Sequence, residues 1–322
     1  MALERGARIT RGIRPTVRAT SLAKPDHSPV SAADYAVQAV TARLLEDLDP
    51  SVSLIAEEDA GALRGMENAG LRSAVVKAVR RFLPAADEAN VLDWVDRGRS
   101  DRPAPRRYWT LDPVDGTKAF IGRGQYAVAL ALIEAGQVVL GGLACPELSL
   151  GADGRVVRSR TSGGIILLAS AGEGTWLRSL RGRVWRRVSV SAIDDSRRAR
   201  MLISVETAHL DPDWLRGVRS HLGIRRAPTR MDSQAKFGLL AAGAFDLILR
   251  LPRREEPEKI WDYAASDVIV HEAGGVVTDL HGNRLRFDSG AILPNPSGLI
   301  ATSPNLHPLV LGAVRAVKVG RG

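Results

Sequence analysis

The stretch YWTLDPVDGTKAF, residues 108–120, contains the sequence signals that decide the fold. Its first five residues are mostly apolar or β-prone and end in a carboxylate, which indicates a strand over 108–112. Pro113 fixes the chain direction after Asp112, and Gly116 permits a sharp bend or the close approach of a phosphate. Asp112 and Asp115 can therefore point to one centre with the backbone carbonyl of Val114 beside them. Thr117 can cap a following helix, whose free N–H groups would face an anion.

Three more acidic residues stand where predicted elements begin or end. Asp34 follows Ser31 by three residues, a capping-box spacing at the start of a helix predicted within 26–48. Glu57 ends a short strand, VSLIAEED (52–59), and Asp262 opens a helix within KIWDYAASDVIVHEAGG (259–275). Each acid alone has an ordinary interpretation: a helix cap for Asp34 and Asp262, a solvated loop for Glu57. Converging carboxylates would repel one another without a cation, and Mg²⁺ prefers such oxygen ligands, so their co-occurrence predicts a metal site.

The remaining pattern predicts mixed α and β structure in two domains. Residues 1–24 look irregular and basic, a helix is expected over 71–83, and 125–148 indicates a hairpin around Glu134-Ala135-Gly136. Beyond about residue 194 strands and helices alternate, which favours an α/β unit. In that part we expect helices over 211–223 and within 233–251, and a hairpin over 276–287 with His281-Gly282-Asn283 at its tip. The expected domains are therefore 1–194, with most metal ligands, and 195–322.

Composition is that of a globular chain. Of 322 residues, 45% are hydrophobic and 25% charged. No apolar run approaches the roughly 20 residues that a membrane-spanning helix needs, and the N-terminus has no secretory pattern. A lone cysteine, Cys145, excludes an internal disulfide and favours a reducing compartment. We expect a cytoplasmic protein with no membrane partner.

The net charge of +9 admits more than one explanation. Basic chains often bind nucleic acid. Here, however, arginine pairs are spread along the whole length, and aromatic residues, which would stack on bases, make up only 5%. Solvated basic faces are the favoured interpretation, and such a surface would also speed capture of a small polyanion. We expect no stable nucleic-acid partner.

Taken together, the segments resemble the inositol monophosphatase superfamily over roughly residues 24–285. The matching segments are DHSPVSAAD (26–34), IAEED (55–59), WTLDPVDGTKAF (109–120) and WDYAASDVIVHEAGGVVTD (261–279). Others are similar to its bisphosphate nucleotidase branch: SPVSAAD (28–34), TKAFIGRGQYAVALALI (117–133), SVETAHLD (204–211) and MDSQAKFG (231–238). The resemblance implies a layered αβαβα sandwich, two or three Mg²⁺ ions, inhibition by Li⁺ and a role in sulfur metabolism. The implied reaction is hydrolysis of the 3′-phosphate of adenosine 3′,5′-bisphosphate, or of its 5′-phosphosulfate relative, by metal-activated water.

The same resemblance implies roles for individual residues. Metal ligands would be the side chains of Glu57, Asp112, Asp115 and Asp262 and the carbonyl of Val114. Asp34 and Thr117 would orient and polarise the attacking water. Substrate contacts would come from Gly116, Thr117, His209, Ser233 and Lys236, with Arg250 stacking on adenine.

The sequence departs from the family pattern in places and leaves alternatives open. The chain before Lys24 is short and Arg-rich, Ala56 replaces a usual glycine, Tyr263 replaces a common histidine, and the Arg- and Asp-rich loop 95–107 has no assigned role. The main alternative is a phosphatase of the same superfamily that acts on an inositol phosphate or a sugar bisphosphate. A nucleic-acid-binding protein and an inactive binding module are further alternatives, and both monomer and homodimer are open.

Overall fold

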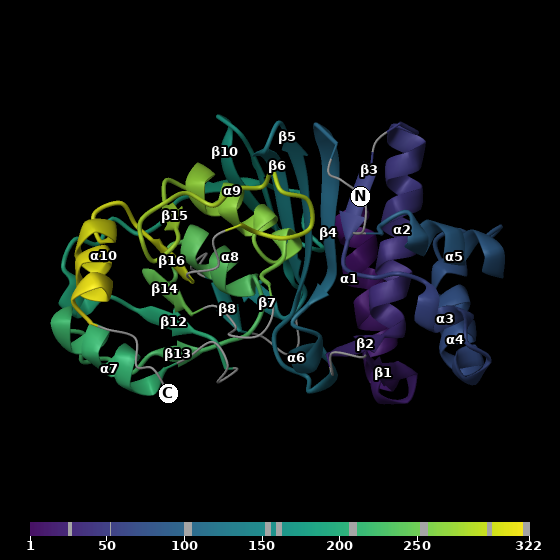
Figure 1. Ribbon diagram of the computed structural model, residues 1–322, viewed down its shortest axis with the longest axis horizontal. Helices are drawn as coiled ribbons and strands as arrows, with labels where there is room; N and C mark the ends of the chain where they lie inside the picture. The colour runs from purple at the N-terminus through teal and green to yellow at the C-terminus, as the bar shows by residue number, and fades with distance from the viewer. Residues whose placement is uncertain are drawn as a thin grey trace.

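A computed structural model describes residues 1–24, 28–51, 53–99, 105–151, 156–158, 163–205, 211–251, 257–294 and 298–317. Within these ranges two large sheets and several helices form five layers (Figure 1). His209 and residues 100–104 of the Arg- and Asp-rich loop 95–107 lie outside the described residues.

The first large sheet has seven strands among the described residues, in the order β11-β10-β9-β6-β5-β4-β3. β3 and β4 run parallel and the other neighbours antiparallel. The predicted hairpin is confirmed: Ala135 and Gly136, both with positive φ, join β5 to β6. The strands are β3 (Ser53–Ala56), β4 (Arg107–Asp115), β5 (Ala127–Glu134), β6 (Gln137–Cys145), β9 (Ile165–Ser170), β10 (Gly174–Ser179) and β11 (Arg186–Val188).

The second large sheet has five strands among the described residues, in the order β13-β12-β14-β16-β15. The strands are β12 (Met201–Ile203), β13 (Thr229–Arg230), β14 (Leu247–Arg250), β15 (Val276–Thr278) and β16 (Leu299–Thr302). The hairpin expected over 276–287 is wrong, because β15 pairs with the buried strand β16. The Asp279 carboxylate accepts hydrogen bonds from the backbone N–H groups of His281 and Asn283, so the polar segment closes on itself as a turn. Two small sheets pair β1 (Ser21–Ala23) with β2 (Pro29–Ser31), and β7 (Leu148–Leu150) with β8 (Val156–Arg158).

The helices form the other three layers (Figure 1). α1 and α2 cover one face of the first sheet, α8 and α9 lie between the sheets, and α7 and α10 cover the far face of the second sheet. The predicted αβαβα sandwich is therefore confirmed. The helices are α1 (Ala2–Ile13), α2 (Ala32–Leu48), α3 (Gly61–Arg64), α4 (Ala69–Arg80), α5 (Glu88–Asp96), α6 (Thr117–Ile121), α7 (Pro212–His221), α8 (Ala235–Ala241), α9 (Ala264–Glu272) and α10 (His307–Ala316), with 3₁₀ turns that include η1 (Arg14–Thr20) and η5 (Ile260–Asp262).

The N-terminal segment is not irregular, and that expectation was wrong. Residues 2–13 form α1, which packs on α2, β5 and β6. Its buried face holds Leu3, Ala7, Ile9 and Ile13, while the basic residues Arg5, Arg8 and Arg11 are spread between them. Residues at these helical spacings share a face, and this apolar stripe is easily overlooked in a segment dominated by arginine.

A single hydrophobic cluster joins the two sheets through α8 and α9. It contains Leu143 and Leu167 from the first sheet, Ile269 from α9, and Ile248 and Ala301 from the second sheet. The division at residue 194 falls between β11 and β12 and stays a prediction. None of the helices formed by the described residues is both long enough and apolar enough to cross a bilayer.

Candidate active site

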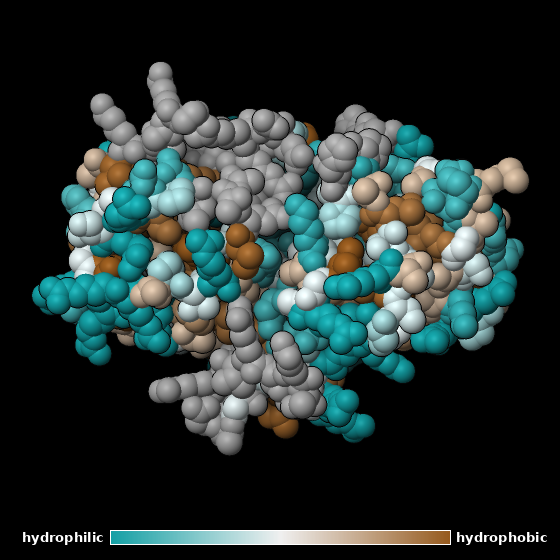
Figure 2. All heavy atoms as spheres, turned by 90° about the horizontal axis from the view of Figure 1, so that it is seen from below, coloured by the Kyte–Doolittle hydropathy of each residue, from teal (hydrophilic) through white to brown (hydrophobic). Residues whose placement is uncertain are grey.

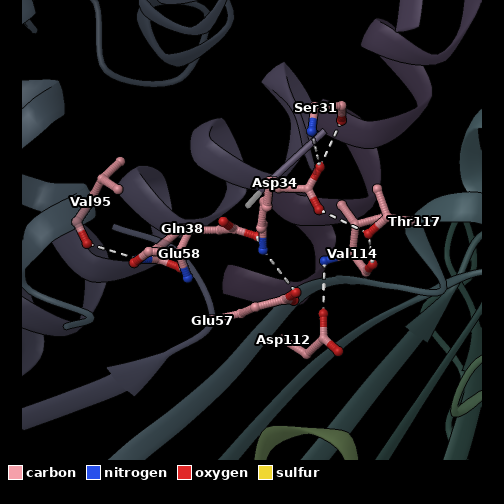
Figure 3. Close-up of polar contacts among 10 residues, drawn as sticks. Ser31, Asp34, Gln38, Glu57, Glu58, Val95, Asp112, Val114 and Thr117 are labelled. Atoms are coloured by element: carbon pink, nitrogen blue, oxygen red, sulfur yellow. Dashed lines mark hydrogen bonds and ion pairs between the residues drawn. The ribbon is translucent and has the colours of Figure 1, made fainter. Parts of the chain in front are cut away.

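The N-terminus of α2 fixes the carboxylate of Asp34. Ser31 caps this helix as predicted, and Asp34 Oδ2 accepts hydrogen bonds from Ser31 N at 2.8 Å and Ser31 Oγ at 2.7 Å. The other oxygen, Oδ1, lies 3.3 Å from Thr117 Oγ1 (Figure 3). Asp34 has no solvent-exposed surface. The helix cap and a link to the DPVDGT turn are therefore made by the same side chain.

The DPVDGT turn begins inside β4. Pairing between β4 and β5 is irregular between Asp112 and Asp115, and such irregularities redirect side chains near sites. Asp112 Oδ1 accepts a hydrogen bond from Val114 N at 3.1 Å (Figure 3). Together with Asp262, Asp112 and Asp115 present carboxylate oxygens that all lie within 4.8 Å of one another. The structure thus brings together three of the acids selected from the sequence.

Thr117 does not cap the next helix, so that expectation was wrong. It is the first residue of α6, and Gly116 precedes it as N-cap with no side-chain capping bond. The Thr117 hydroxyl donates instead to the Val114 carbonyl at 2.9 Å. Gly116 adopts φ +87°, and an added Cβ would lie 3.0 Å from Ser233 Cβ. A side chain at this position would be strained and would press on the loop before α8.

Asp262 lies in η5, immediately before α9, and does not cap that helix by its side chain. Gln234 ties this turn to β4: its backbone N–H donates to the Asp115 carboxylate, and its Nε2 donates to the Trp261 carbonyl at 3.0 Å. Ser266 Oγ donates to Gln234 Oε1 at 2.9 Å. Asp115 and Asp262, from opposite halves of the chain, are held together through this buried amide.

Glu57 lines the same cleft, but its carboxylate contacts a cation. Lys24 Nζ lies 3.1 Å from Glu57 Oε1 and 2.7 Å from Glu58 Oε1. Gln38, one turn after Asp34 on α2, donates from Nε2 to the carbonyls of Glu58 at 2.5 Å and Val95 at 2.7 Å (Figure 3). These contacts fix the end of β3. Sequence patterns did not single out Lys24 for this role, nor Gln38, Glu58 and Gln234.

Burial, together with the negative charge of neighbouring carboxylates, raises the pKa values of four aspartates in the site: Asp34, Asp112, Asp115 and Asp262. Burial, followed by the charge of Glu57, raises the pKa of Asp34 to about 6, and burial raises the pKa of Asp115 to about 6 although the Gln234 N–H opposes it. Burial also raises the pKa of Asp262 to about 8, against the opposing effect of Arg250. The pKa of Asp112 rises well above its usual value because of burial and the charges of Glu57 and Asp115.

The residues at the centre of the site fit a hard divalent cation. Carboxylate oxygens of the buried Asp112 and the half-buried Asp115 and Asp262 converge, and their raised pKa values indicate an excess of negative charge that a bound cation would offset. This donor set has no sulfur or imidazole among the described residues, which favours a hard ion over a soft one. The cluster can bind a metal.

These acids line a cleft of about 450 Å³ between the two halves of the chain. Predicted substrate residues line it from both sides: Gly116 and Thr117 from the first half, and Ser233, Lys236 and Arg250 from the second. Lys24, Lys118 and Lys259 add further positive charge. The lining of the cleft therefore combines clustered carboxylates with basic side chains, a combination suited to a metal beside a phosphate.

Arg250 is held inside the cleft wall. Its Nη2 donates to Glu258 Oε2 at 3.0 Å, and its guanidinium lies 4.9 Å from the centre of the Tyr263 ring. The Tyr263 hydroxyl also donates to Glu258 Oε2, at 2.5 Å. Tyr263, noted in the sequence as an unusual residue, thus belongs to a buried group with Arg250 and Glu258. The predicted adenine stacking of Arg250 stays a prediction.

On the face seen in Figure 2, hydrophilic and apolar side chains of the described residues are interspersed. Hydrophilic side chains of described residues occupy both ends of that face, with small apolar areas between them.

With this geometry in place, comparison with known proteins defines the class. The family model described as "Inositol monophosphatase family" matches residues 3–318, and the chain belongs to that family. Within it, the chain is similar to the bisphosphate nucleotidases. A 3′(2′),5′-bisphosphate nucleotidase of Oryza sativa is 38% identical over 98% of this chain and 91% of the relative. A 3′,5′-bisphosphate nucleotidase 2 of Arabidopsis thaliana is 37% identical over 98% and 94%.

Solved structures support the fold. An IMPase of Thermotoga maritima superimposes with a TM-score of 0.65 at 20% identity, covering 98% of this chain and 94% of that structure. An inositol monophosphatase of Anabaena (Nostoc) gives a TM-score of 0.61 at 18% identity, covering 98% and 93%. At this identity the likeness concerns the fold alone.

Proposed function

We propose that this protein is a Mg²⁺-dependent 3′(2′),5′-bisphosphate nucleotidase that converts adenosine 3′,5′-bisphosphate to AMP and phosphate. The observation that carries the proposal is the cleft whose lining includes both the converging carboxylates and the basic residues Lys236 and Arg250. The similarity to nucleotidases over nearly the whole chain supports the nucleotide as substrate. The 5′-phosphosulfate relative has the same 3′-phosphate and is a second substrate of the same reaction.

Asp112, Asp115 and Asp262 would hold the metal, with Glu57 and the Val114 carbonyl completing two or three Mg²⁺ sites. Bound Mg²⁺ would lower the pKa of the water it holds and would offset charge on the phosphate and the leaving 3′-oxygen. The Lys24 ammonium supplies positive charge beside the Glu57 carboxylate. Its pKa is raised, because Glu57 and Glu58 outweigh the lowering effect of burial, so it stays protonated near neutral pH.

Asp34 and Thr117 would orient the attacking water. The Thr117 hydroxyl has one proton, which it directs to the Val114 carbonyl or to Asp34 Oδ1, and its lone pairs remain available to a water. Ser31 holds the Asp34 carboxylate from the other side, so the pair cannot rotate freely.

Lys236 and Ser233, in and before α8, would bind the nucleotide's second phosphate or its ribose, and Arg250 would contact the base. His209 is predicted to lie near the same pocket. We further propose that the protein acts in a reducing, cytoplasmic compartment as a monomer or homodimer. The free, buried Cys145 is compatible with a reducing compartment.

The test of this reaction is the identity of the product. The protein is incubated with adenosine 3′,5′-bisphosphate and Mg²⁺, and the products are separated from authentic AMP and adenosine 3′-phosphate. We expect AMP and one equivalent of phosphate, and no turnover after EDTA. Formation of adenosine 3′-phosphate would contradict the orientation of the substrate, and full turnover in EDTA would contradict the metal site.

A further inference from the structure

Arg14 makes a set of contacts outside the cleft. It lies at the start of η1, directly after α1, and its side chain is 12% exposed. Its Nε donates to the Phe120 carbonyl at 3.3 Å and its Nη2 donates to the Gly124 carbonyl at 2.7 Å. Its Nη1 pairs with the Glu147 carboxylate. All three donor nitrogens of the guanidinium therefore have partners from two loops of the first sheet.

The guanidinium also lies on aromatic rings. Its carbon is 5.6 Å from the centre of the Phe120 ring and 5.0 Å from that of the Tyr126 ring. These rings meet edge to face at 4.7 Å, and the Tyr126 hydroxyl donates to Thr10 on α1 at 3.0 Å. A planar, delocalised cation is suited to such a site, because it can stack and donate in several directions at once.

The segment that Arg14 contacts is the short helix of the DPVDGT turn. α6 has five residues, and a helix of this length does not persist without tertiary contacts. Positive φ angles at Gly116 and Arg123 bound it on both sides. Its first residue is Thr117. The distance from the Thr117 hydroxyl to Asp34 Oδ1 is 3.3 Å, which is long for a hydrogen bond. A small shift of α6 would break this contact.

We propose that Arg14 is a positioning residue for the site: by fixing the C-terminal end of α6 it sets the Thr117 hydroxyl against Asp34. The inference rests on the proposed role of Thr117 in water orientation. Asp112, Asp115 and Asp262 lie on β4 and η5, so loss of Arg14 should slow turnover without a matching loss of Mg²⁺ affinity. It also gives the Arg-rich N-terminal segment a function that charge alone did not indicate.

Arg178 offers a matched control. It is 11% exposed, pairs with Glu4 and lies 4.8 Å from the centre of the Trp185 ring. Its Nη1 donates to backbone carbonyls, among them Ser179 at 3.0 Å and Gly182 at 2.9 Å. Like Arg14, Arg178 is absent from the lining of the cleft. Its hydrogen bonds within the described part of the chain go to Glu4 and to carbonyls of residues 179–182, and none goes to α6.

The experiment compares Arg14→Gln and Arg14→Lys with Arg178→Gln by amide hydrogen exchange and steady-state kinetics. We expect exchange over 117–124 to quicken at least tenfold, and kcat to fall about tenfold or more, in Arg14→Gln only. Arg14→Lys should show intermediate exchange and kcat, since one ammonium cannot replace all the contacts that the guanidinium makes with the Phe120 and Gly124 carbonyls. If Arg14→Gln does not fold, Arg14→Lys is the variant that tests the proposal. The Mg²⁺ concentration for half-maximal rate should stay within twofold.

Unchanged exchange over 117–124 in both Arg14 variants would overturn the proposal. So would equal losses of kcat in Arg14→Gln and Arg178→Gln. Hydrogen exchange needs no substrate, and kcat can be followed on the phosphomonoester that the wild type hydrolyses fastest. A wild type that prefers an inositol phosphate would therefore contradict the nucleotide assignment and leave the test of Arg14 intact.

Discussion

The Thr117 hydroxyl lies between two oxygens from different parts of the chain, 3.3 Å from Asp34 Oδ1 and 2.9 Å from the Val114 carbonyl. Asp34 comes from the N-terminus of α2, whereas Val114 comes from the irregular end of β4. A single side chain thus links the proposed water-orienting carboxylate to the proposed metal ligands.

Thr117→Val removes this hydroxyl and keeps the shape of the side chain. We expect kcat to fall about 10²-fold or more, the scale of a lost positioned proton-transfer group, while the Mg²⁺ requirement stays close to that of the wild type. Thr117→Ser keeps the hydroxyl and serves as the control, with kcat within about tenfold of wild type. A Thr117→Val enzyme with normal kcat would exclude the hydroxyl from the reaction.

Asp112→Asn should abolish catalysis without unfolding the protein. The carboxylate is buried among like charges, so a neutral amide relieves repulsion in the metal-free protein. We expect kcat to drop by at least about 10³-fold, the scale of a lost electrostatic group. The melting temperature in EDTA should be unchanged or higher.

Asp246 is the matched buried acid outside the site. Its carboxylate accepts hydrogen bonds from Arg200 Nε at 2.8 Å and Ser191 Oγ at 2.6 Å. Asp246→Asn should destabilise the fold by about 3 kcal/mol, because it leaves a charged partner unpaired, and should keep kcat. Normal kcat together with a lowered melting temperature in Asp112→Asn, the pattern expected of Asp246→Asn, would contradict the assignment of Asp112 as a metal ligand.

Metal binding should stabilise the protein more at pH 8 than at pH 5. The pKa values of Asp34, Asp115 and Asp262 are raised in the folded state, to about 6, 6 and 8, so the metal-free fold binds more protons than the unfolded chain. The stability that these acids contribute therefore falls as the pH rises from about 4 to about 8. We expect bound Mg²⁺ to offset this loss of stability, because its positive charge takes the place of the protons that the acids have released.

The measurement is the melting temperature with and without Mg²⁺ at each pH. At 100 times its Kd an ion stabilises by about 2.7 kcal/mol, or about 5 °C for a chain of this size. We expect a shift of this order at pH 8 and a smaller one at pH 5. A larger shift at pH 5 would contradict the pKa ordering.

Tyr263→Phe tests the group around Arg250. It removes the hydroxyl that donates to buried Glu258 at 2.5 Å. We expect KM to rise several-fold with kcat less affected, since Arg250 lies in the cleft wall, and stability to fall by about 1–3 kcal/mol. Tyr108→Phe removes a buried hydroxyl that donates to the Phe287 carbonyl at 2.8 Å and lies outside the cleft lining, so it should lose similar stability with an unchanged KM. Equal KM values in the two variants would show that the Tyr263 hydroxyl does not contribute to substrate binding.

Local chemistry made part of this site predictable from the sequence. The capping box of Ser31 and Asp34 depends on residues three apart, and the Asp112–Thr117 turn on contiguous ones, so both were visible. Resemblance to a family added the layered fold. The expected helix cap by Thr117 was wrong, because its hydroxyl bonds the Val114 carbonyl and contacts Asp34 instead.

The missed residues act across long sequence separations. Lys24 meets Glu57, Gln38 meets Val95, Gln234 meets Asp115, and Arg14 meets Gly124. Each alone is a common surface-type residue with no pattern around it. Its role follows from burial, and burial depends on how the layers pack. α1 was missed for a related reason, since its apolar stripe is outnumbered by arginine in the sequence.

The most direct test of the central claim is a comparison of kcat/KM for adenosine 3′,5′-bisphosphate, inositol 1-phosphate and fructose 1,6-bisphosphate, each with Mg²⁺ and with EDTA. The account predicts a clear preference, at least about 10²-fold, for the nucleotide, and loss of all activity in EDTA. Preference for inositol 1-phosphate or the sugar bisphosphate would contradict the nucleotide assignment and the proposed roles of Ser233, Lys236 and His209.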